Sequence, residues 1–542
     1  MKKLKKEYRM IDTILLNGNI ITLNENRPRV KSLAISYGRV VALGADDEIR
    51  QLANAGTRVV NLDGQTVLPG LTDAHLHWEA QSRALRSVNI FEAPQKQIAI
   101  DQVRERVRET PAGEWVQGQG WAQDLWRDRA FPTRHDLDEV APVHPVYLSA
   151  KSGHAAWVNT AALQRAGITD STADPEGGQI LRDADGAATG ILLETAMDLV
   201  SARIPSPAGD ELADMMMDAQ ARALRSGVTM IHDFDEPTCL AALQILRERG
   251  ALSLRVLKQI NQPWLDAAIA SGIRSGFGDD WIRIGALKLF ADGALGPKTA
   301  LMFDPYLGES DNYGMALVDK EEMIEYVSRA SEFGLPSSVH AIGDKAVHDA
   351  LDVFESVRRQ EAERGEARSC RRHRIEHVQI VHPQDADRLA ELDVIASMQP
   401  IHATSDMVTA DRYWGERAAY AYNPRLQLEK GARVAFGSDA PVEPLDPLIG
   451  IHAAVTRKRD GKPDGGWYPE ARLGIHETIL GFTQGPAFAA RMEDRLGKLS
   501  EGYLADLIVL DRDIYQVEPE EILELKVLGT MVDGEWRYRD FD

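Results

Sequence analysis

Two histidines stand two residues apart at the end of a short apolar run. The segment 66–77 reads TVLPGLTDAHLH, and we interpret residues 71–77 as a buried strand that ends in His75 and His77. Side chains alternate along a strand, so both imidazoles lie on one face of it. Neutral imidazole nitrogens at the C-terminal end of a barrel strand can hold a metal ion. A lone His-x-His motif is weak evidence for a metal, so the interpretation depends on partners elsewhere in the chain.

Further candidate ligands stand at or near the ends of other predicted strands. Taken singly, His340 could be a core histidine and Asp439 could cap the following helix. Together they are improbable as coincidences, because parallel barrel strands bring their C-terminal ends to one mouth. The sequence therefore predicts a metal site with the ligands His75, His77, Lys288, His340, His377 and Asp439.

The lysine in this set can bind a metal only in a modified form, because an ammonium group has no lone pair. Burial and nearby cations lower the pKa of a lysine, so Lys288 could react with carbon dioxide and become a carbamate anion. We favour two cations bridged by carbamylated Lys288 over a single cation, with a metal-activated hydroxide as the nucleophile. Asp439 would be both a ligand and a catalytic residue that carries a proton from the attacking water to the leaving amine. The alternative is an unmodified Lys288 paired with Asp292 or another acid.

The middle of the chain alternates between short apolar strands and helix-length segments, which is typical of a parallel α/β sheet. Eight strands are predicted, at 71–77, 227–233, 252–257, 282–289, 335–340, 373–377, 394–399 and 432–439. Eight such strands favour a (β/α)8 TIM barrel, here over residues 70–484. The connection 83–210 is far longer than one helix requires, so we expect an inserted substrate lobe after the first barrel strand.

Both ends of the chain are rich in short strands and turns, as in the segment LIVLD at 507–511. Neither end is large enough to form a core alone. We therefore predict one composite β-sandwich, formed by residues 10–69 and 485–542 together.

Composition excludes several classes of partner. The 542 residues carry a formal charge of −21 and a pI near 5.2, which argues against nucleic acid and anionic membranes. No run approaches the ~18 apolar residues of a membrane span, and no apolar stretch follows the basic start as in a signal peptide. With only Cys239 and Cys370 present, we expect a reducing, cytoplasmic location. The expected partner is a small-molecule substrate, and a homodimer is the candidate assembly.

The motifs resemble the amidohydrolase superfamily. PGLTDAHLH at 69–77 together with GSD at 437–439 is specific at the superfamily level. The segments GQGW at 118–121, KLFADGALG at 288–296 and SMQPIH at 397–402 look like the amidohydrolase-3 branch, which includes N-substituted formamide deformylases. The resemblance implies a metal-dependent hydrolase of non-peptide C–N bonds, with zinc as the usual metal.

Substrate contacts are expected near the mouth and from the inserted lobe. Trp78 follows the metal pair directly, and Trp121 follows two glycines that would let the backbone approach a neighbour closely. These indoles could form an aromatic lid over an apolar substrate, or they could be core residues. His154 is the candidate for orienting the scissile carbonyl, a choice that the branch resemblance supports. His402, at the end of predicted strand seven, is a second candidate.

The favoured function is hydrolysis of an amide-like C–N bond in a small apolar or aromatic substrate. One alternative is an aminohydrolase (deaminase) on the same scaffold. The resemblance implies that such deaminases generally use one metal and lack the strand-four lysine, so Lys288 favours amide hydrolysis. The other alternative is a non-catalytic regulatory or binding barrel. A missing ligand would have favoured it, and the sequence retains all of them.

Overall fold

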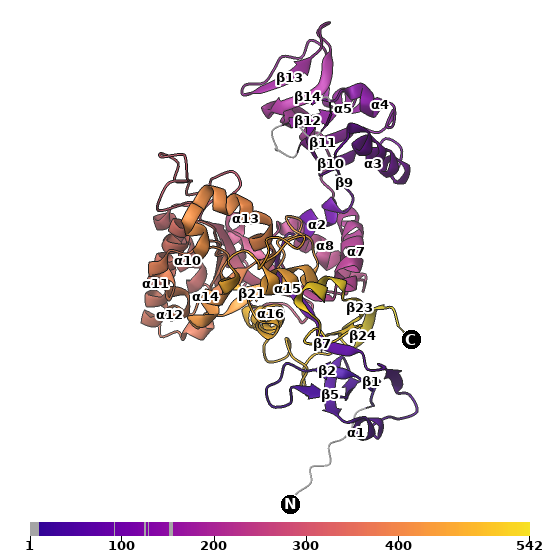
Figure 1. The fold of residues 1–542 in the computed structure, drawn as a ribbon, viewed down its shortest axis with the longest axis vertical. Coiled ribbons are helices and arrows are strands. Elements are labelled where there is room, and N and C mark those ends of the chain that lie inside the picture. Colours follow the sequence, from indigo (N-terminus) through magenta and orange to yellow (C-terminus); the bar gives the residue numbers. More distant parts are fainter. Residues whose placement is uncertain (1–9, 92, 124–125, 128, 151–154, 542) are drawn as a thin grey trace, which may run out of the picture. The chain divides into compact units, whose positions relative to one another are not determined.

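The computed structural model describes residues 10–91, 93–123, 126–127, 129–150 and 155–541. The chain divides into two compact units, of which one comprises the residues up to Glu79 and from Met216 onward, and the other Ala80–Met215. Figure 1 labels the elements of both. Among the described residues, no helix is long and apolar enough to cross a membrane. The domain boundaries given above stay predictions.

The larger unit contains the predicted barrel. Its sheet has eight parallel strands in the order β21-β20-β19-β18-β17-β16-β15-β8. Backbone hydrogen bonds join the two end strands, from the Asp439 N–H to the His75 carbonyl (2.7 Å) and from the His77 N–H to the Ala440 carbonyl (2.8 Å). The bounds are β8 Leu71–Leu76, β15 Val228–Asp233, β16 Arg255–Asn261, β17 Ile282–Phe290, β18 Ser337–Ala341, β19 Arg374–His377, β20 Ile395–Met398 and β21 Val434–Phe436. The (β/α)8 fold is confirmed.

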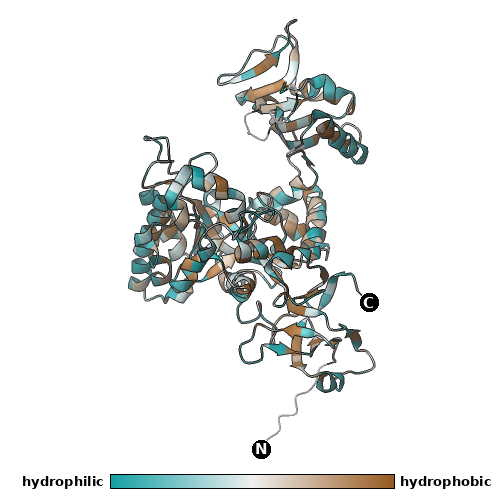
Figure 2. Ribbon diagram, in the orientation of Figure 1, coloured by the Kyte–Doolittle hydropathy of each residue, from teal (hydrophilic) through white to brown (hydrophobic). Residues whose placement is uncertain are grey.

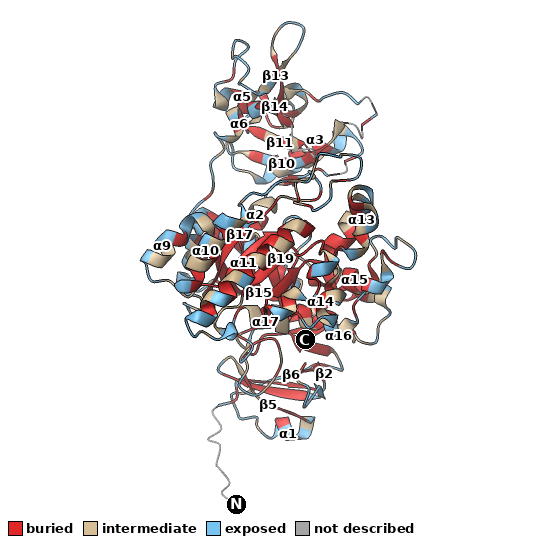
Figure 3. Ribbon diagram, turned by 90° about the vertical axis from the view of Figure 1, so that its left-hand side faces the viewer, coloured by how far each residue is buried: buried red, intermediate tan, exposed pale blue. Residues whose placement is uncertain are grey.

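Helices cover the outside of this sheet, and Figure 3 shows the strands buried and the helices partly exposed. Long helices present one apolar side to the strands; α11, for example, buries Val347, Leu351 and Phe354. This amphipathic pattern is what packs a helix on a sheet. The helices are α7 Asp210–Arg225, α8 Pro237–Glu248, α9 Leu265–Ala270, α10 Lys320–Glu332, α11 Asp344–Glu363, α12 Arg388–Glu391, α13 Pro400–Trp414, α14 Pro424–Glu429, α15 Pro447–Thr456, α16 Ile475–Gly481 and α17 Gln484–Ala489.

One barrel strand differs from its prediction. Residues 252–257 were the expected third strand, whereas β16 begins at Arg255 and runs to Asn261. The N–H groups of Ala251 and Leu252 instead donate to the carbonyl of Leu246, which closes the end of α8. The first apolar residues of the predicted strand therefore belong to a helix terminus, where buried leucines often accompany the final turn.

Strands from both termini form two further sheets, as the predicted composite sandwich requires. One has the order β5-β4-β1-β6, and the other β24-β23-β22-β7-β2-β3. In the second, β7 pairs antiparallel with β22, so the two ends of the chain share a sheet. The bounds are β1 Thr13–Leu16, β2 Asn19–Ile21, β3 Arg29–Val30, β4 Ser32–Ser36, β5 Arg39–Gly44, α1 Asp46–Arg50, β6 Arg58–Asn61, β7 Thr66–Pro69, β22 Leu507–Leu510, β23 Val527–Val532 and β24 Glu535–Arg539.

The smaller unit is a lobe with its own six-stranded sheet, in the order β13-β14-β12-β11-β10-β9. Its apolar core contains Trp121, Trp126 and Trp157, and Figure 2 shows hydrophobic residues on the strands. The bounds are β9 Val88–Asn89, α3 Lys96–Glu109, β10 Val116–Trp121, α4 Arg134–Asp138, β11 Val146–Ala150, β12 Ala155–Val158, α5 Thr160–Ala166, β13 Gly178–Arg182, β14 Ala188–Glu194 and α6 Asp198–Ser201. Helix α2 is Trp78–Ala84.

Candidate metal centre

The barrel strands bring the predicted ligands together at one mouth. His75, His377 and Asp439 each offer a ligand atom, and these atoms lie within 4.8 Å of one another. His340 joins them, since its ring centroid is 4.5 Å from that of His377. His77 Nε2 lies 3.6 Å from Asp439 Oδ1, the same distance as His75 Nε2. All five side chains come from the larger unit.

Backbone geometry near the site is unusual. His377 and Asp439 have positive φ angles, of 74° and 62°, which non-glycine residues rarely adopt outside strained sites. A Cβ on Gly437 would lie 2.4 Å from the backbone nitrogen of His75, so only glycine fits there. Asp73 accepts hydrogen bonds from the N–H of His75 (3.1 Å) and of Ser438 (3.0 Å). These contacts lock the turn that carries Asp439 against strand β8.

Each predicted histidine ligand has one ring nitrogen held by an oxygen acceptor. His75 Nδ1 lies 2.6 Å from Glu376 Oε2, and His77 Nδ1 lies 2.9 Å from Asp235 Oδ1. These oxygens belong to carboxylates, which accept hydrogen bonds when ionised, so the ring nitrogen donates. Donation from Nδ1 leaves the Nε2 lone pair of both rings for a metal.

The other two histidines are backed by neutral oxygens. His377 Nδ1 lies 2.9 Å from Gln399 Oε1, and His340 Nε2 lies 2.9 Å from the Gly293 carbonyl. In His340 the nitrogen left for a metal is therefore Nδ1. The sequence motifs did not identify these partners, Glu376, Asp235 and Gln399, although each stands within two residues of a strand end.

Glu376 is a fully buried carboxylate beneath the site. Arg374 Nη2 donates to it over 2.9 Å, and the hydroxyl of Ser338 donates to its other oxygen. Despite burial, the charge of Arg374 and the hydrogen bond from His75 hold the pKa of Glu376 well below its usual range. An ionised carboxylate therefore stands behind His75.

Burial controls the protonation of the other groups. It lowers the pKa of His75 and His377 well below the usual range and that of His340 to about 3. Burial opposes protonation of His77 as well, but the hydrogen bond and charge of Asp235 raise its pKa. At neutral pH, His75, His340 and His377 are uncharged and keep a lone pair, which is the form that binds metals.

Lys288 lies at the same mouth with its ammonium nitrogen buried and, among the described residues, without a hydrogen-bond partner. The nitrogen is 4.7 Å from the ring centre of Phe234 and 4.6 Å from that of Phe290. Burial lowers the pKa of Lys288 to about 8, although Glu376 and Asp439 oppose the shift. An amine with so low a pKa is partly uncharged near neutral pH.

Among the described residues, Lys288 Nζ forms no hydrogen bond with Asp292, and whether the lysine is modified stays a prediction. Asp292 accepts hydrogen bonds from the backbone N–H groups of Leu301, Ile342 and Gly343 at 2.8–3.0 Å. The carboxylate thereby fixes the loop whose Gly293 carbonyl holds His340.

Asp439 is buried, and this raises its pKa to about 6, against the effect of His77 and Lys288. The carboxylate is therefore mostly ionised at neutral pH, yet it can accept and release a proton within an accessible range. Its second oxygen, Oδ2, lies 3.8 Å from Nε2 of His402.

The predicted substrate contacts have different positions. Trp78 begins helix α2, is buried, and its N–H donates to Asp233 Oδ1 over 2.9 Å. His402 lies in the first turn of α13 rather than at a strand end, because Pro400 starts a helix directly after β20. His154 lies outside the described residues.

Trp121 is a core residue of the lobe, so its predicted substrate contact is not supported. Its side chain is 0% exposed, and its indole N–H donates to the Leu148 carbonyl over 2.8 Å. The preceding glycine has a packing role, since a Cβ on Gly118 would lie 2.7 Å from the Val88 carbonyl of the neighbouring strand.

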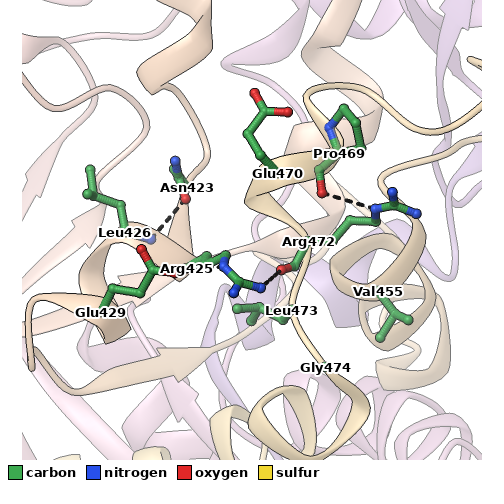
Figure 4. A pocket seen from close by; sticks show the side chains of 10 residues that line it. All are labelled: Asn423, Arg425, Leu426, Glu429, Val455, Pro469, Glu470, Arg472, Leu473 and Gly474. Carbon is green, nitrogen blue, oxygen red and sulfur yellow. Dashed lines mark hydrogen bonds and ion pairs between the residues drawn. The ribbon is translucent and has the colours of Figure 1, made fainter.

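Two other features of the larger unit can be set aside. A surface pocket has a volume of about 780 Å³, and none of the residues around it is a predicted ligand. Figure 4 shows its side chains, among them Arg425, which donates to the Arg472 carbonyl. Asp233, Asp235 and Cys239 also offer closely spaced ligand atoms. The ammonium of Lys258, 2.9 Å from Asp233 Oδ2, already pairs with one of these carboxylates.

Comparisons with known proteins extend over both units. The profile of the Amidohydrolase family matches residues 58–538. Protein LONG AFTER FAR-RED 3 of Arabidopsis thaliana is 32% identical over 97% of this chain and 91% of its own length. N-substituted formamide deformylase of Arthrobacter pascens is 29% identical over 98% of both chains. A crystal structure of an uncharacterized metal-dependent hydrolase from Pyrococcus furiosus has a TM-score of 0.77 and 30% identity, covering 93% of this chain and 100% of that one.

Proposed function

The chain belongs to the amidohydrolase family of metal-dependent hydrolases, and on that basis we propose that it is a zinc enzyme that hydrolyses N-substituted formamides or closely related amides. The observation that carries this proposal is the mouth of the barrel, where imidazole, carboxylate and lysine side chains converge while buried. His75 Nε2 and Lys288 Nζ have no hydrogen-bond partner among the described residues. Buried polar atoms are nearly always paired, so these atoms await a group from outside the chain.

The donor set fits zinc. Histidine nitrogens and carboxylate oxygens are its usual ligands, and neutral imidazoles need no deprotonation before binding. His75, His77, His340, His377 and Asp439 would hold one or two zinc ions, and we favour two ions with carbamylated Lys288 between them. When bound, zinc supplies Lewis acidity and a hydroxide nucleophile at neutral pH.

The surroundings of Lys288 support its carbamylation. In the uncharged form its nitrogen would attack the carbon of carbon dioxide, forming a C–N bond while one C=O electron pair moves to oxygen, and the nitrogen would release a proton to water. The product is an anion in place of a cation. The low pKa of about 8 makes the uncharged amine available, and the anion would offset the repulsion between two cations.

Asp439 is the proton carrier in this proposal. Its carboxylate accepts the proton of the attacking water and then delivers it to the nitrogen of the leaving amine. The position supports this assignment, since Oδ1 lies 3.6 Å from Nε2 of both His75 and His77.

The substrate class rests on a relative and on one side chain. The Arthrobacter pascens relative carries the name N-substituted formamide deformylase. Phe290, whose ring packs against His340 with centroids 5.1 Å apart, is 40% exposed. An exposed phenyl ring beside the proposed ligands suits an apolar or aromatic N-substituent. The role of His154, the cytoplasmic location and the homodimer stay predictions.

Purification without chelators, followed by turnover assays with zinc-loaded protein, tests the proposal. The panel contains N-benzylformamide and N-butylformamide, the matching acetamides, and amino-substituted purines and pyrimidines for the aminohydrolase alternative. We expect equal release of formate and amine from the formamides. Ammonia release from the amino-substituted rings, without amide cleavage, would support a deaminase instead.

A further inference from the structure

We propose that His402 is a further catalytic residue, whose Nε2–H donates a hydrogen bond to the carbonyl oxygen of the substrate as negative charge develops there. The proposal rests on the amide hydrolysis proposed above. It assigns the proton of His402 to one nitrogen and identifies the side chains that keep it there.

His402 faces the mouth with a free ring nitrogen. Its side chain is 7% exposed, and Nε2 is buried without a hydrogen-bond partner in the described part of the chain. Nε2 lies 3.8 Å from Asp439 Oδ2, which is too long for a hydrogen bond but leaves the two groups facing one space. The ring also stacks on His377, with centroids 6.1 Å apart and planes 16° apart.

A chain of polar contacts lies behind the ring. Gln379 Nε2 is 3.4 Å from His402 Nδ1. The Tyr422 hydroxyl is 2.9 Å from Gln379 Oε1 and 2.7 Å from Asp406 Oδ2. The backbones are joined as well, because the Tyr422 N–H donates to the Gln379 carbonyl.

The donors and acceptors along this chain determine which ring nitrogen of His402 carries the proton. The Tyr422 hydroxyl has one proton but touches two oxygens, and Gln379 Oε1 has no proton to give. Both oxygens accept from this hydroxyl, so the amide oxygen of Gln379 faces Tyr422 and its NH2 group faces His402. Gln379 Nε2 then donates to Nδ1 of His402, and the proton of the neutral imidazole must sit on Nε2.

A neutral donor is suited to this position. Because Nδ1 accepts a hydrogen from the Gln379 amide, the ring is neutral and does not repel metal cations. In the reaction, a water oxygen bonds to the carbonyl carbon and the C=O electron pair moves to oxygen, where Nε2–H stabilises it. Asp439 takes the water proton. When the pair returns, the C–N bond breaks and Asp439 protonates the amine.

Two substitutions of His402 separate donation from packing. His402→Phe keeps a ring without a donor, and His402→Gln keeps an amide N–H at similar reach. For zinc-loaded protein and N-benzylformamide we expect His402→Phe to lower kcat about 10²–10³-fold, the usual loss for one oxyanion donor, with KM and zinc content nearly unchanged. The kcat of His402→Gln should be at least about tenfold higher than that of His402→Phe. The control is His452→Gln, at a buried histidine of α15, which should leave kcat unchanged.

The tautomer itself can be read without turnover. Nitrogen-15 NMR of histidine-labelled, zinc-loaded protein should show an Nε2–H ring whose signals vanish in His402→Gln. Gln379→Glu places a carboxylate at Nδ1 and should move the proton to Nδ1. An Nδ1–H ring in the wild type, or full kcat in His402→Phe, would overturn the proposal. If no formamide is cleaved, the proposed function fails, while the NMR result still decides the tautomer.

Discussion

The core of the lobe and the mouth of the barrel both bury polar nitrogens, but they differ in whether these nitrogens have hydrogen-bond partners. In the lobe, the indole N–H groups of Trp121, Trp126 and Trp157 donate to backbone carbonyls over 2.8, 3.2 and 2.8 Å. At the mouth, equally buried nitrogens of His75, Lys288 and His402 have no partner among the described residues.

This difference separates stability from function. A buried polar group without a partner reduces the free energy of unfolding by about 1–3 kcal/mol. Several such groups persist in one place only if another interaction, such as a bound ligand, offsets this loss. The lobe pairs these three indole N–H groups with its own backbone and gains stability. The mouth leaves them for a metal and a substrate, and changes there should affect chemistry more than folding.

The largest expected effect is at the mouth. His75→Ala or His377→Ala should abolish formamide turnover, because each removes a ligand. The far-UV circular dichroism spectrum and solubility should stay nearly unchanged, since neither ring holds the barrel together. More than about a tenth of wild-type activity with metal still bound would show that the ligand assignment is wrong.

In the lobe we expect the opposite, a loss of stability without a loss of zinc. Trp121→Ala should destabilise this unit by about 3–5 kcal/mol, as for other buried tryptophans, and zinc content should not change. Hydrogen exchange of strands β10 and β11 measures the effect, with Trp121→Phe as the milder control. Unchanged protection together with a raised KM would restore the interpretation of Trp121 as part of a substrate lid.

Asp439→Asn tests the chemistry of the mouth more finely. An amide oxygen can still bind a metal but cannot carry a proton, so zinc should be retained at least partly. Turnover should fall at least about a hundredfold, with loss of the acid limb of the pH–rate profile. Near-normal turnover with an unchanged profile would leave Asp439 as a structural residue.

The smallest effect is expected for the side chains that accept hydrogen bonds from the candidate ligand histidines. Asp235→Asn removes the charge that backs His77, and zinc affinity should fall about 10–100-fold in a chelator competition. Asp411→Asn, at a carboxylate 3.0 Å from the Trp467 indole nitrogen, is the matched control and should not change affinity. Equal affinities in both variants would mean that Asp235 does not support the ligand.

The sequence was sufficient to predict the barrel and the convergence of the candidate ligands, because parallel strands end at one mouth. It could not reveal Glu376. Neighbouring residues on a strand face opposite sides, so a residue beside the ligand His377 should point away from the site. Yet Glu376 reaches His75, and the positive φ of His377, 74°, breaks the alternation.

The lobe was harder to interpret for a related reason. The glycines before Trp121 indicated a close approach of the backbone, and the sequence could not say to what. The neighbour is strand β9, whose Val88 carbonyl leaves no room for a Cβ on Gly118. Pairing between strands that are distant in sequence is set by the whole sheet and has no local signal.

Lys288 provides the most direct test of the central claim, that the buried, unpaired groups of the mouth hold zinc. The measurement is zinc per chain, by elemental analysis of protein purified without chelator, for the wild type, Lys288→Ala and Lys288→Arg. We expect zinc in the wild type and the loss of both zinc and activity in the two variants, with partial recovery of Lys288→Ala by small carboxylic acids. Arginine cannot replace the lysine, because a guanidinium stays charged and repels the ions. A wild type without zinc, or a Lys288→Arg variant that keeps zinc and activity, would contradict this claim.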